Sequence, residues 1–133
     1  MKNYDQLVED ALTRVKEIMP WDLARRLKSD ADAAPLLLDV REPSEFAALH
    51  IPGSISAPRG VLEQSCEWDY DETIPQLVTA SEREIVLICR SGKRSVLAAD
   101  TMQQMGYRNV VEELRYFCRL AGIKGVFLGP GDR

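Results

Sequence analysis

The stretch EIVLICRSGKRS, residues 84–95, joins a strand pattern directly to a helix pattern. Residues 84–89 form an apolar, β-branched run of the kind found in buried central strands. Residues 94–105 repeat apolar side chains at helical spacing, and Gly106 follows as a helix stop. A buried strand that passes through a short loop into a helix predicts a parallel α/β sheet.

The loop between these two elements has the composition of an anion-binding site. Ligands of open α/β sheets bind where strands end and helices begin, because backbone N–H groups are unsatisfied there and the helix dipole is positive. Gly92 allows backbone angles that are closed to other residues. These donors and the three cations of the loop, Arg90, Lys93 and Arg94, favour a thiolate at Cys89. We therefore predict Cys89 as the catalytic nucleophile, with the substrate bound by Arg90, Ser91, Gly92, Lys93, Arg94 and Ser95.

Outward from this loop, strand and helix patterns alternate along the chain. Residues 36–40 are a second apolar run, and a helix that begins at Pro43 follows it. This order predicts an α/β domain of three layers, with helices on both faces of a mostly parallel sheet. The other predicted elements are helices over residues 21–27, 74–80 and 113–121, strands within residues 51–58 and 107–111, and a surface excursion over residues 63–70.

The first residues carry a separate helical pattern. Residues 4–18 place apolar side chains at helical spacing, with charged side chains on the other face, which predicts an amphipathic helix. Pro20 interrupts the pattern. We therefore divide the chain into an N-terminal amphipathic helix within residues 1–18, packed on a domain of residues 19–133.

The composition limits the function of the protein. The 133 residues suffice for one domain, and 45% hydrophobic and 29% charged residues are typical of a globular chain. The net charge of -4 argues against nucleic acid as a partner, because a phosphate-binding surface needs an excess of Lys and Arg. The sequence has no signal-peptide pattern and no apolar run of membrane length, so we expect a cytoplasmic protein without a membrane partner.

The cysteines and the histidine argue against a metal centre and a disulfide framework. Cys66, Cys89 and Cys118 are odd in number and form no Cys-x-x-Cys pair, and His50 is the only histidine. We therefore expect a mechanism that needs no metal and no cofactor. Cys66 and Cys118 are expected to be small buried apolar residues.

Three stretches of the sequence together resemble the rhodanese family. Two of them are LDVREPSEF at residues 38–46 and HIPGS at residues 50–54. The third is the active-site loop of the family, which is matched at Cys89, Gly92, Arg94 and Ser95. Each motif alone is weak evidence, but their order and spacing make the combination specific.

The resemblance spans residues 19–111 and implies a five-stranded parallel sheet flanked by helices. It also implies a thiosulfate sulfurtransferase, in which sulfane sulfur passes from thiosulfate or a persulfide donor to Cys89. The resulting persulfide would then deliver the sulfur to a thiol, to cyanide or to a sulfur-acceptor protein. After Val111 the chain lacks the Gly-Gly pair and the Trp-containing helix that are common in the family, so the C-terminal segment is atypical.

Other charged residues of the matched stretches have a structural interpretation. Asp39 and Arg41 end a buried strand, where a charge pair would satisfy groups that otherwise carry a desolvation cost. Arg59 either faces the same crevice and helps to hold an oxyanion, or is an exposed arginine. We assign a structural or orienting role, with catalysis by the histidine as the alternative, to Asp39, Arg41, Glu45 and His50.

Two other functions stay open at this point. Cysteine phosphatases and arsenate reductases also hold an oxyanion in a loop from Cys to Arg, but five residues separate the two there, whereas four separate Cys89 from Arg94. A rhodanese-like binding or redox-sensing module would use Cys66 or Cys118 as a resolving thiol. The sulfurtransferase interpretation itself requires a thiolate that a donor can reach, and a neutral thiol packed away from solvent would contradict it.

Overall fold

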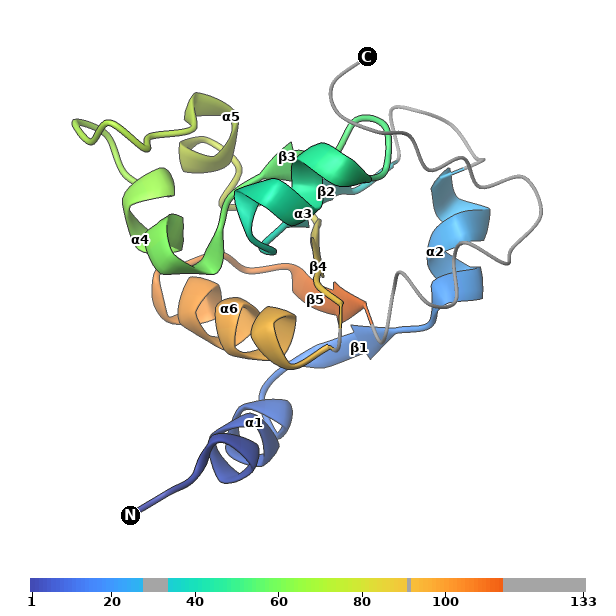
Figure 1. Cartoon of the computed structure of the whole chain (residues 1–133), viewed down its shortest axis with the longest axis vertical. Helices are drawn as coiled ribbons and strands as arrows, with labels where there is room; N and C mark the ends of the chain where they lie inside the picture. Colours follow the sequence, from blue (N-terminus) through green and yellow to red (C-terminus); the bar gives the residue numbers. More distant parts are fainter. Residues whose placement is uncertain (28–33, 91, 114–133) are drawn as a thin grey trace.

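A sheet of five parallel strands forms the centre of the protein (Figure 1). The computed structural model describes residues 1–27, 34–90 and 92–113. The strand order is β1-β5-β4-β2-β3, with the bounds Lys16–Ile18 for β1, Leu36–Asp39 for β2, Ile55–Ser56 for β3, Ile85–Ile88 for β4 and Val110–Glu113 for β5. The predicted α/β fold with a five-stranded parallel sheet is confirmed.

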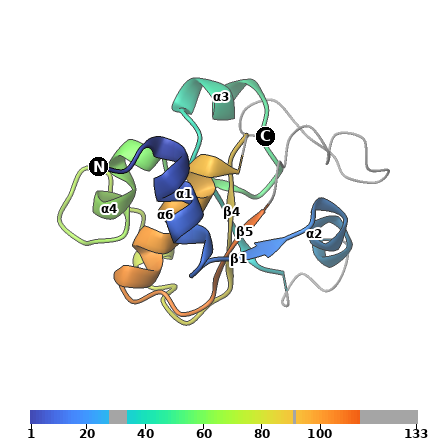
Figure 2. The same cartoon turned by 90° about the horizontal axis from the view of Figure 1, so that it is seen from below.

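Helices lie on both faces of this sheet, as predicted. Helix α6 covers one face and α2 the other (Figure 2). Parallel strands need crossover connections, and these helices supply them. The bounds are Tyr4–Leu12 for α1, Pro20–Leu27 for α2, Pro43–Ala48 for α3, Leu62–Ser65 for α4, Pro75–Val78 for α5 and Lys93–Gln104 for α6, with a short 3-10 helix, η2, over Arg59–Val61.

The two central strands β2 and β4 are buried on both faces. Leu38 lies in the core on the α6 side together with Met102, whereas its neighbour Leu37 lies in the core on the α2 side together with Leu23. Successive side chains of a strand point to opposite faces, so an uninterrupted apolar run supplies both cores. This is the physical reason why these strands could be predicted from their composition.

The N-terminal helix is shorter than the sequence pattern predicts. Helix α1 ends at Leu12, and Lys16–Ile18 form the edge strand β1, which pairs in parallel with β5. The prediction of helix through residue 18 is therefore wrong after Leu12. Pairing with the open edge of β5 satisfies backbone groups of both strands and outweighs a weak helical preference. The division of the chain at residue 18 stays a prediction.

The segment predicted as a surface excursion is only partly exposed. Helix α4 ends within it, and Ser65 and Cys66 are buried, whereas Trp68 and Tyr70 are exposed. The predicted last helix over residues 113–121 and Cys118 lie outside the described residues. Within residues 1–27, 34–90 and 92–113, no helix has the length and apolar character needed to cross a bilayer.

The fold brings the carboxyl ends of β2 and β4 side by side. Asp39 at the end of β2 is in register with Ile88 at the end of β4. Each strand then leads into a helix, α3 after β2 and α6 after β4. The loops that follow these two strands are therefore neighbours, and they contain the residues predicted to form the site.

Candidate active site

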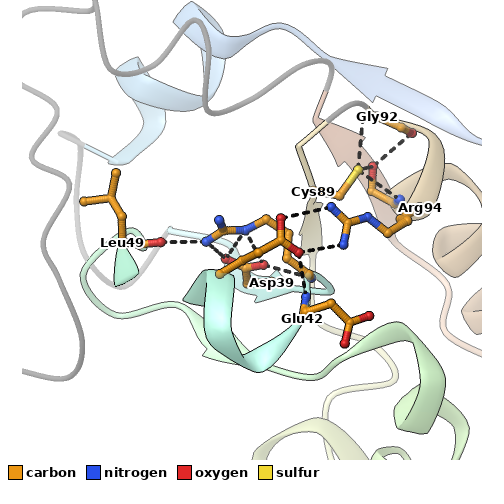
Figure 3. A network of polar contacts seen from close by, with 9 residues as sticks. Asp39, Glu42, Leu49, Cys89, Gly92 and Arg94 are labelled. Carbon is orange, nitrogen blue, oxygen red and sulfur yellow. Dashed lines mark hydrogen bonds and ion pairs between the residues drawn. The ribbon is translucent and has the colours of Figure 1, made fainter. Parts of the chain in front are cut away.

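Cys89 directly follows the central strand β4, and its sulfur lies at the N-terminus of α6 (Figure 3). The Sγ atom accepts hydrogen bonds from the backbone N–H of Gly92, at 3.0 Å, and of Ser95, at 3.3 Å. The N-cap residue of α6 is Gly92, which has no side chain to accept these bonds. The cysteine sulfur therefore takes the place of the side-chain acceptor that usually caps a helix.

The conformation of Gly92 makes this contact possible. Its φ of 87° and ψ of -14° lie in the left-handed region, which favours glycine because a Cβ atom would be strained there. The turn redirects the chain from β4 into α6 and points the Gly92 N–H at the sulfur. Ser91, the neighbouring loop residue, lies outside the described residues.

The Ser95 hydroxyl is a third polar group at the sulfur. Its Oγ atom lies 3.3 Å from Sγ and accepts a hydrogen bond from the thiol, while the hydroxyl donates to the backbone oxygen of Gly92 at 3.2 Å. A hydroxyl can rotate between accepting and donating. Ser95 is thus able to contact both a neutral thiol and a thiolate at Cys89.

Cys89 itself is fully enclosed, with an exposed fraction of 0%. This differs from what a reachable thiolate requires, because the described sulfur has no surface that faces solvent. Ser95 is likewise at 0%, whereas the neighbouring Arg90 is exposed. A reactant can approach the sulfur only if part of the loop moves.

Two of the three loop cations are paired with acids from distant segments. Arg94 binds Glu45 of α3 through two hydrogen bonds, at 2.8 and 3.3 Å (Figure 3). Lys93 binds Asp5 of α1 at 2.7 Å. Within the described part of the chain, Arg90 makes no hydrogen bond or ion pair. The positive charge predicted from the loop sequence is thus compensated in large part by the fold.

The Arg94–Glu45 pair couples the loop to helix α3. Hydrogen bonding to Arg94 is the main cause that lowers the pKa of Glu45 from an ordinary 4.5 to about 2. The same pair raises the pKa of Arg94. Glu45 also accepts a hydrogen bond from the Glu42 N–H, at 3.0 Å, so its carboxylate closes the first turn of α3. Glu45 is therefore placed to orient Arg94.

The stability of the protein should depend on pH through Glu45. Between pH 2 and 4.5 the unfolded chain binds a proton at this residue that the folded protein does not bind, so the stabilising contribution is complete above 4.5 and disappears as the pH falls toward 2. We expect Glu45→Gln to lower the free energy of unfolding by about 2 kcal/mol near neutral pH and to have little effect at the acid limit. Urea unfolding across this pH range measures the difference. An equal pH dependence in the variant would contradict it, and Glu9→Gln, at an exposed position of α1, is the control.

Asp39 and Arg41 form a buried ion pair beneath the site. The Arg41 side chain donates to both carboxylate oxygens of Asp39 at 2.8 to 3.1 Å, and the Arg41 backbone N–H donates to the same carboxylate at 3.0 Å. Arg41 also donates to the backbone oxygen of Leu49 at 2.6 Å. The pair thereby ties the end of β2 to the end of α3.

His50 is buried just after helix α3 and contacts Phe46 of that helix. Its Nδ1 atom lies 2.7 Å from the backbone oxygen of Phe46, and its ring stacks on the Phe46 ring with the centroids 3.7 Å apart. Arg59 binds Glu63 at 3.0 Å and Thr101 at 3.1 Å, about two turns along α6 from Lys93. The structural roles assigned to Asp39, Arg41, Glu45 and His50 stay predictions, and these contacts are the geometry on which they rest.

The remaining described cysteine lies in the main core. Cys66 is buried among the apolar residues on the α6 side, and burial is the main cause that raises the pKa of its thiol. Cys66 and Cys89 are both free thiols in the structure. Among the described residues no group of three His, Cys, Asp or Glu side chains is arranged to hold a metal ion.

Asp5 is the residue near the loop that sequence reasoning missed. It is 88 positions from Lys93 in the chain, so no motif or short spacing connects the two. Only the packing of α1 along α6 brings them together. Asp5 in the first turn of a helix otherwise has the ordinary role of an acidic residue at a helix N-terminus.

The chain is thus a parallel α/β domain in which a cysteine sulfur caps the helix that follows the central strand β4. The sequence profile of the family described as Rhodanese-like domain matches residues 20–115, which is most of the chain. This protein therefore belongs to the rhodanese-like domain family. The resemblance stated from three sequence motifs is confirmed.

Several curated proteins are similar in sequence. Thiosulfate:glutathione sulfurtransferase of Saccharomyces cerevisiae is 33% identical over 88 residues, which cover 64% of this chain and 63% of that protein. A protein named Sulfurtransferase from Allochromatium vinosum is 32% identical over 97 residues, or 73% of this chain and 79% of that protein. YrkF of Bacillus subtilis is 36% identical over 88 residues but is matched over only 42% of its length. This chain thus spans less than two thirds of the first and third of these relatives.

Solved structures show the same architecture. A protein of Rhodopseudomonas palustris, described as "Protein of Unknown Function RPA3614, Possible Tyrosine Phosphatase", superimposes with a TM-score of 0.80 at 27% identity, covering 91% of this chain and 90% of that chain. The Rhodanese-like domain of the Anabaena protein Alr3790 has a TM-score of 0.69 at 19% identity, covering 86% and 78%. The second likeness shows the fold alone.

Proposed function

We propose that this protein is a sulfurtransferase that carries sulfane sulfur as a persulfide on Cys89. The observation that carries the proposal is the position of Sγ, which accepts hydrogen bonds from the N–H groups of Gly92 and Ser95 at the start of α6. Such donors and a helix N-terminus stabilise a sulfur anion. The names of two sulfurtransferase relatives support the same chemistry.

The reaction divides into two displacements at sulfur. In the first, the Cys89 thiolate attacks the outer sulfur of thiosulfate, the S–S bond of thiosulfate breaks, and its electron pair leaves with sulfite. Cys89 then holds a persulfide with one negative charge. In the second, an acceptor thiolate or cyanide attacks the outer sulfur of the persulfide, and Cys89 returns as a thiolate. A persulfide donor reacts in the same way and releases a thiolate.

The loop supplies electrostatic stabilisation at both stages. The same N–H groups that contact Sγ are fixed by the helix, so they need little rearrangement as charge moves between the two sulfurs. Ser95 can turn its hydroxyl toward the anion once the thiol proton has left to solvent. No metal or cofactor enters these steps, because a sulfane sulfur is already an electrophile.

Access to the sulfur requires motion of the loop. Because Cys89 is fully enclosed, the donor has to displace a neighbouring group before attack, and the outer sulfur of the persulfide has to occupy the space that opens. An S–S bond of about 2 Å places that sulfur closer to Sγ than the present contacts at 3.0 and 3.3 Å, so neighbouring groups have to move outward to admit it. We propose that the loop opens for loading and that the N–H groups of α6 then hold the persulfide.

The test is sulfur loading of the intact chain. Incubation with thiosulfate should add the mass of one sulfur atom at Cys89, and cyanide should remove it as thiocyanate. Failure to load with thiosulfate, methanethiosulfonate or a low-molecular-weight persulfide would overturn the proposal. Hydrolysis of a phosphotyrosine substrate without sulfur loading would favour a cysteine phosphatase, and a Cys89 disulfide after mild peroxide without loading would favour a redox-sensing module.

Two glycines with the same φ offer a matched test of the loop. Gly92 and Gly53 both have a φ of 87°, but only Gly92 contacts Sγ, and a Cβ on Gly53 would meet nothing within 4 Å. Alanine at either position should cost about 1 to 2 kcal/mol of stability from left-handed strain. We expect Gly92→Ala alone to lower the transfer rate, by about tenfold, because its N–H shifts from the sulfur. Equal transfer rates in the two variants, measured with thiosulfate and cyanide, would contradict this role.

A further inference from the structure

Helix α1 brings a carboxylate to the first turn of α6, beside the Cys89 loop. The Asp5 Oδ1 atom lies 2.7 Å from the Lys93 Nζ atom, and the same Nζ lies 5.3 Å from the centroid of the Tyr4 ring. Lys93 follows Gly92, whose N–H contacts Sγ. Asp5 of helix α1, at the other end of the sequence, therefore offsets the charge of Lys93, which lies next to the N–H groups that bind Sγ.

Two further contacts hold α1 in this place. Val8 lies in one apolar cluster with Val96, and Arg14 donates two hydrogen bonds to Asp100, at 2.8 and 2.9 Å. Lys93, Val96 and Asp100 are spaced by three and four residues, so they lie along one face of α6. Helix α1 runs along that face, and Asp5 reaches the loop because the rest of α1 is fixed.

The position of Asp5 offsets an unfavourable charge. A cation in the first turn of a helix is disfavoured by the helix dipole, and Lys93 is the first residue of α6. Asp5 pairs with it there, and Glu45 pairs with Arg94. With three cations and two contacting carboxylates, the side chains of the loop and their partners carry about one net positive charge, where the loop sequence alone indicates three.

We propose that Asp5 is a specificity-determining residue, which disfavours a sulfur donor with two negative charges and favours a donor with one. The proposal rests on the proposed sulfurtransferase function. Helix α1 lies outside the residues matched by the family, 20–115, so this is a feature of the chain's own N-terminal segment. The donor class that follows is a monoanionic persulfide or thiosulfonate.

Two donors of similar size isolate the effect of charge. Thiosulfate is a dianion, and methanethiosulfonate is a monoanion in which a methyl group replaces one anionic oxygen. Attack by Cys89 breaks the S–S bond of either donor and gives the same persulfide, with sulfite leaving in one case and methanesulfinate in the other. A change in the ratio of their kcat/KM values therefore reports the charge at the site rather than the chemistry of the intermediate.

The experiment compares Asp5→Asn with Asp10→Asn at low and high salt. Asp10 is on the same helix and also pairs with a cation, Arg14, but not with a loop residue. We expect Asp5→Asn to raise the thiosulfate to methanethiosulfonate ratio of kcat/KM about fivefold at low salt, and less at high salt where charges are screened. Asp10→Asn should leave the ratio unchanged, and Asp5→Glu should restore the wild-type ratio.

The failure of this inference is distinguishable from failure of the proposed function. If wild type loads sulfur from both donors but Asp5→Asn leaves the ratio unchanged, or if Asp10→Asn changes it equally, Asp5 does not determine specificity. If wild type loads from neither donor, the sulfurtransferase proposal itself fails. Thermal unfolding of both variants measures any loss of α1 packing. A ratio that changes without the salt dependence would show a structural effect and would also overturn the inference.

Discussion

The Cys89→Ser variant is expected to take up no sulfur from thiosulfate and to lose transfer activity by more than about 10³-fold. A serine oxygen can accept the N–H groups of Gly92 and Ser95 in place of the sulfur, so the helix cap is retained. An alcohol does not ionise at neutral pH and forms no persulfide. The loss should therefore be chemical rather than structural, and intact mass after incubation with donor measures it.

Cys66→Ala is the matched control for this prediction. Cys66 is also a buried free thiol, but it lies in the apolar core, and burial raises the pKa of its thiol. We expect this variant to load one sulfur as wild type does. If Cys89→Ser still loads sulfur and Cys66→Ala does not, the sulfur is carried by Cys66, and the proposed site is wrong.

The largest effect on stability is expected from Asp39→Asn. This change removes the carboxylate charge that the buried Arg41 guanidinium contacts, and both residues are enclosed, with Asp39 1% and Arg41 5% exposed. Removing one partner of a buried ion pair costs about 3 to 5 kcal/mol, since the remaining charge is desolvated without compensation. We expect a loss of about 3 kcal/mol, because the asparagine oxygen can still accept from the Arg41 N–H. Urea unfolding followed by far-UV circular dichroism measures it.

An exposed pair gives the control for this second prediction. Asp22 and Arg25 form an ion pair one turn apart on α2, with side chains 40% and 76% exposed. Asp22→Asn should change the free energy of unfolding by less than about 0.5 kcal/mol, because water already screens this pair. If the two aspartate variants lose equal stability, the Asp39–Arg41 pair does not hold the ends of β2 and α3 together.

The local patterns of the sequence predicted the elements that depend on local physics. The apolar runs before Asp39 and before Cys89 are strands β2 and β4, and the Pro43 start is helix α3. These predictions were correct because strands buried on both faces have a continuous apolar composition, and because proline favours the first turn of a helix. The prediction failed at Lys16–Ile18, where pairing with the distant strand β5 determines the structure.

The sequence by itself determined the hydrogen-bond donors around Sγ, because the groups that bind it lie within seven consecutive residues, 89–95. A strand, a glycine and a helix start suffice to place their N–H groups. The tertiary structure alone decided how much positive charge remains there, because Asp5 and Glu45 reach Lys93 and Arg94 across 88 and 49 positions of the chain. It also decided that Cys89 is enclosed, because burial depends on the packing of segments that no local pattern connects.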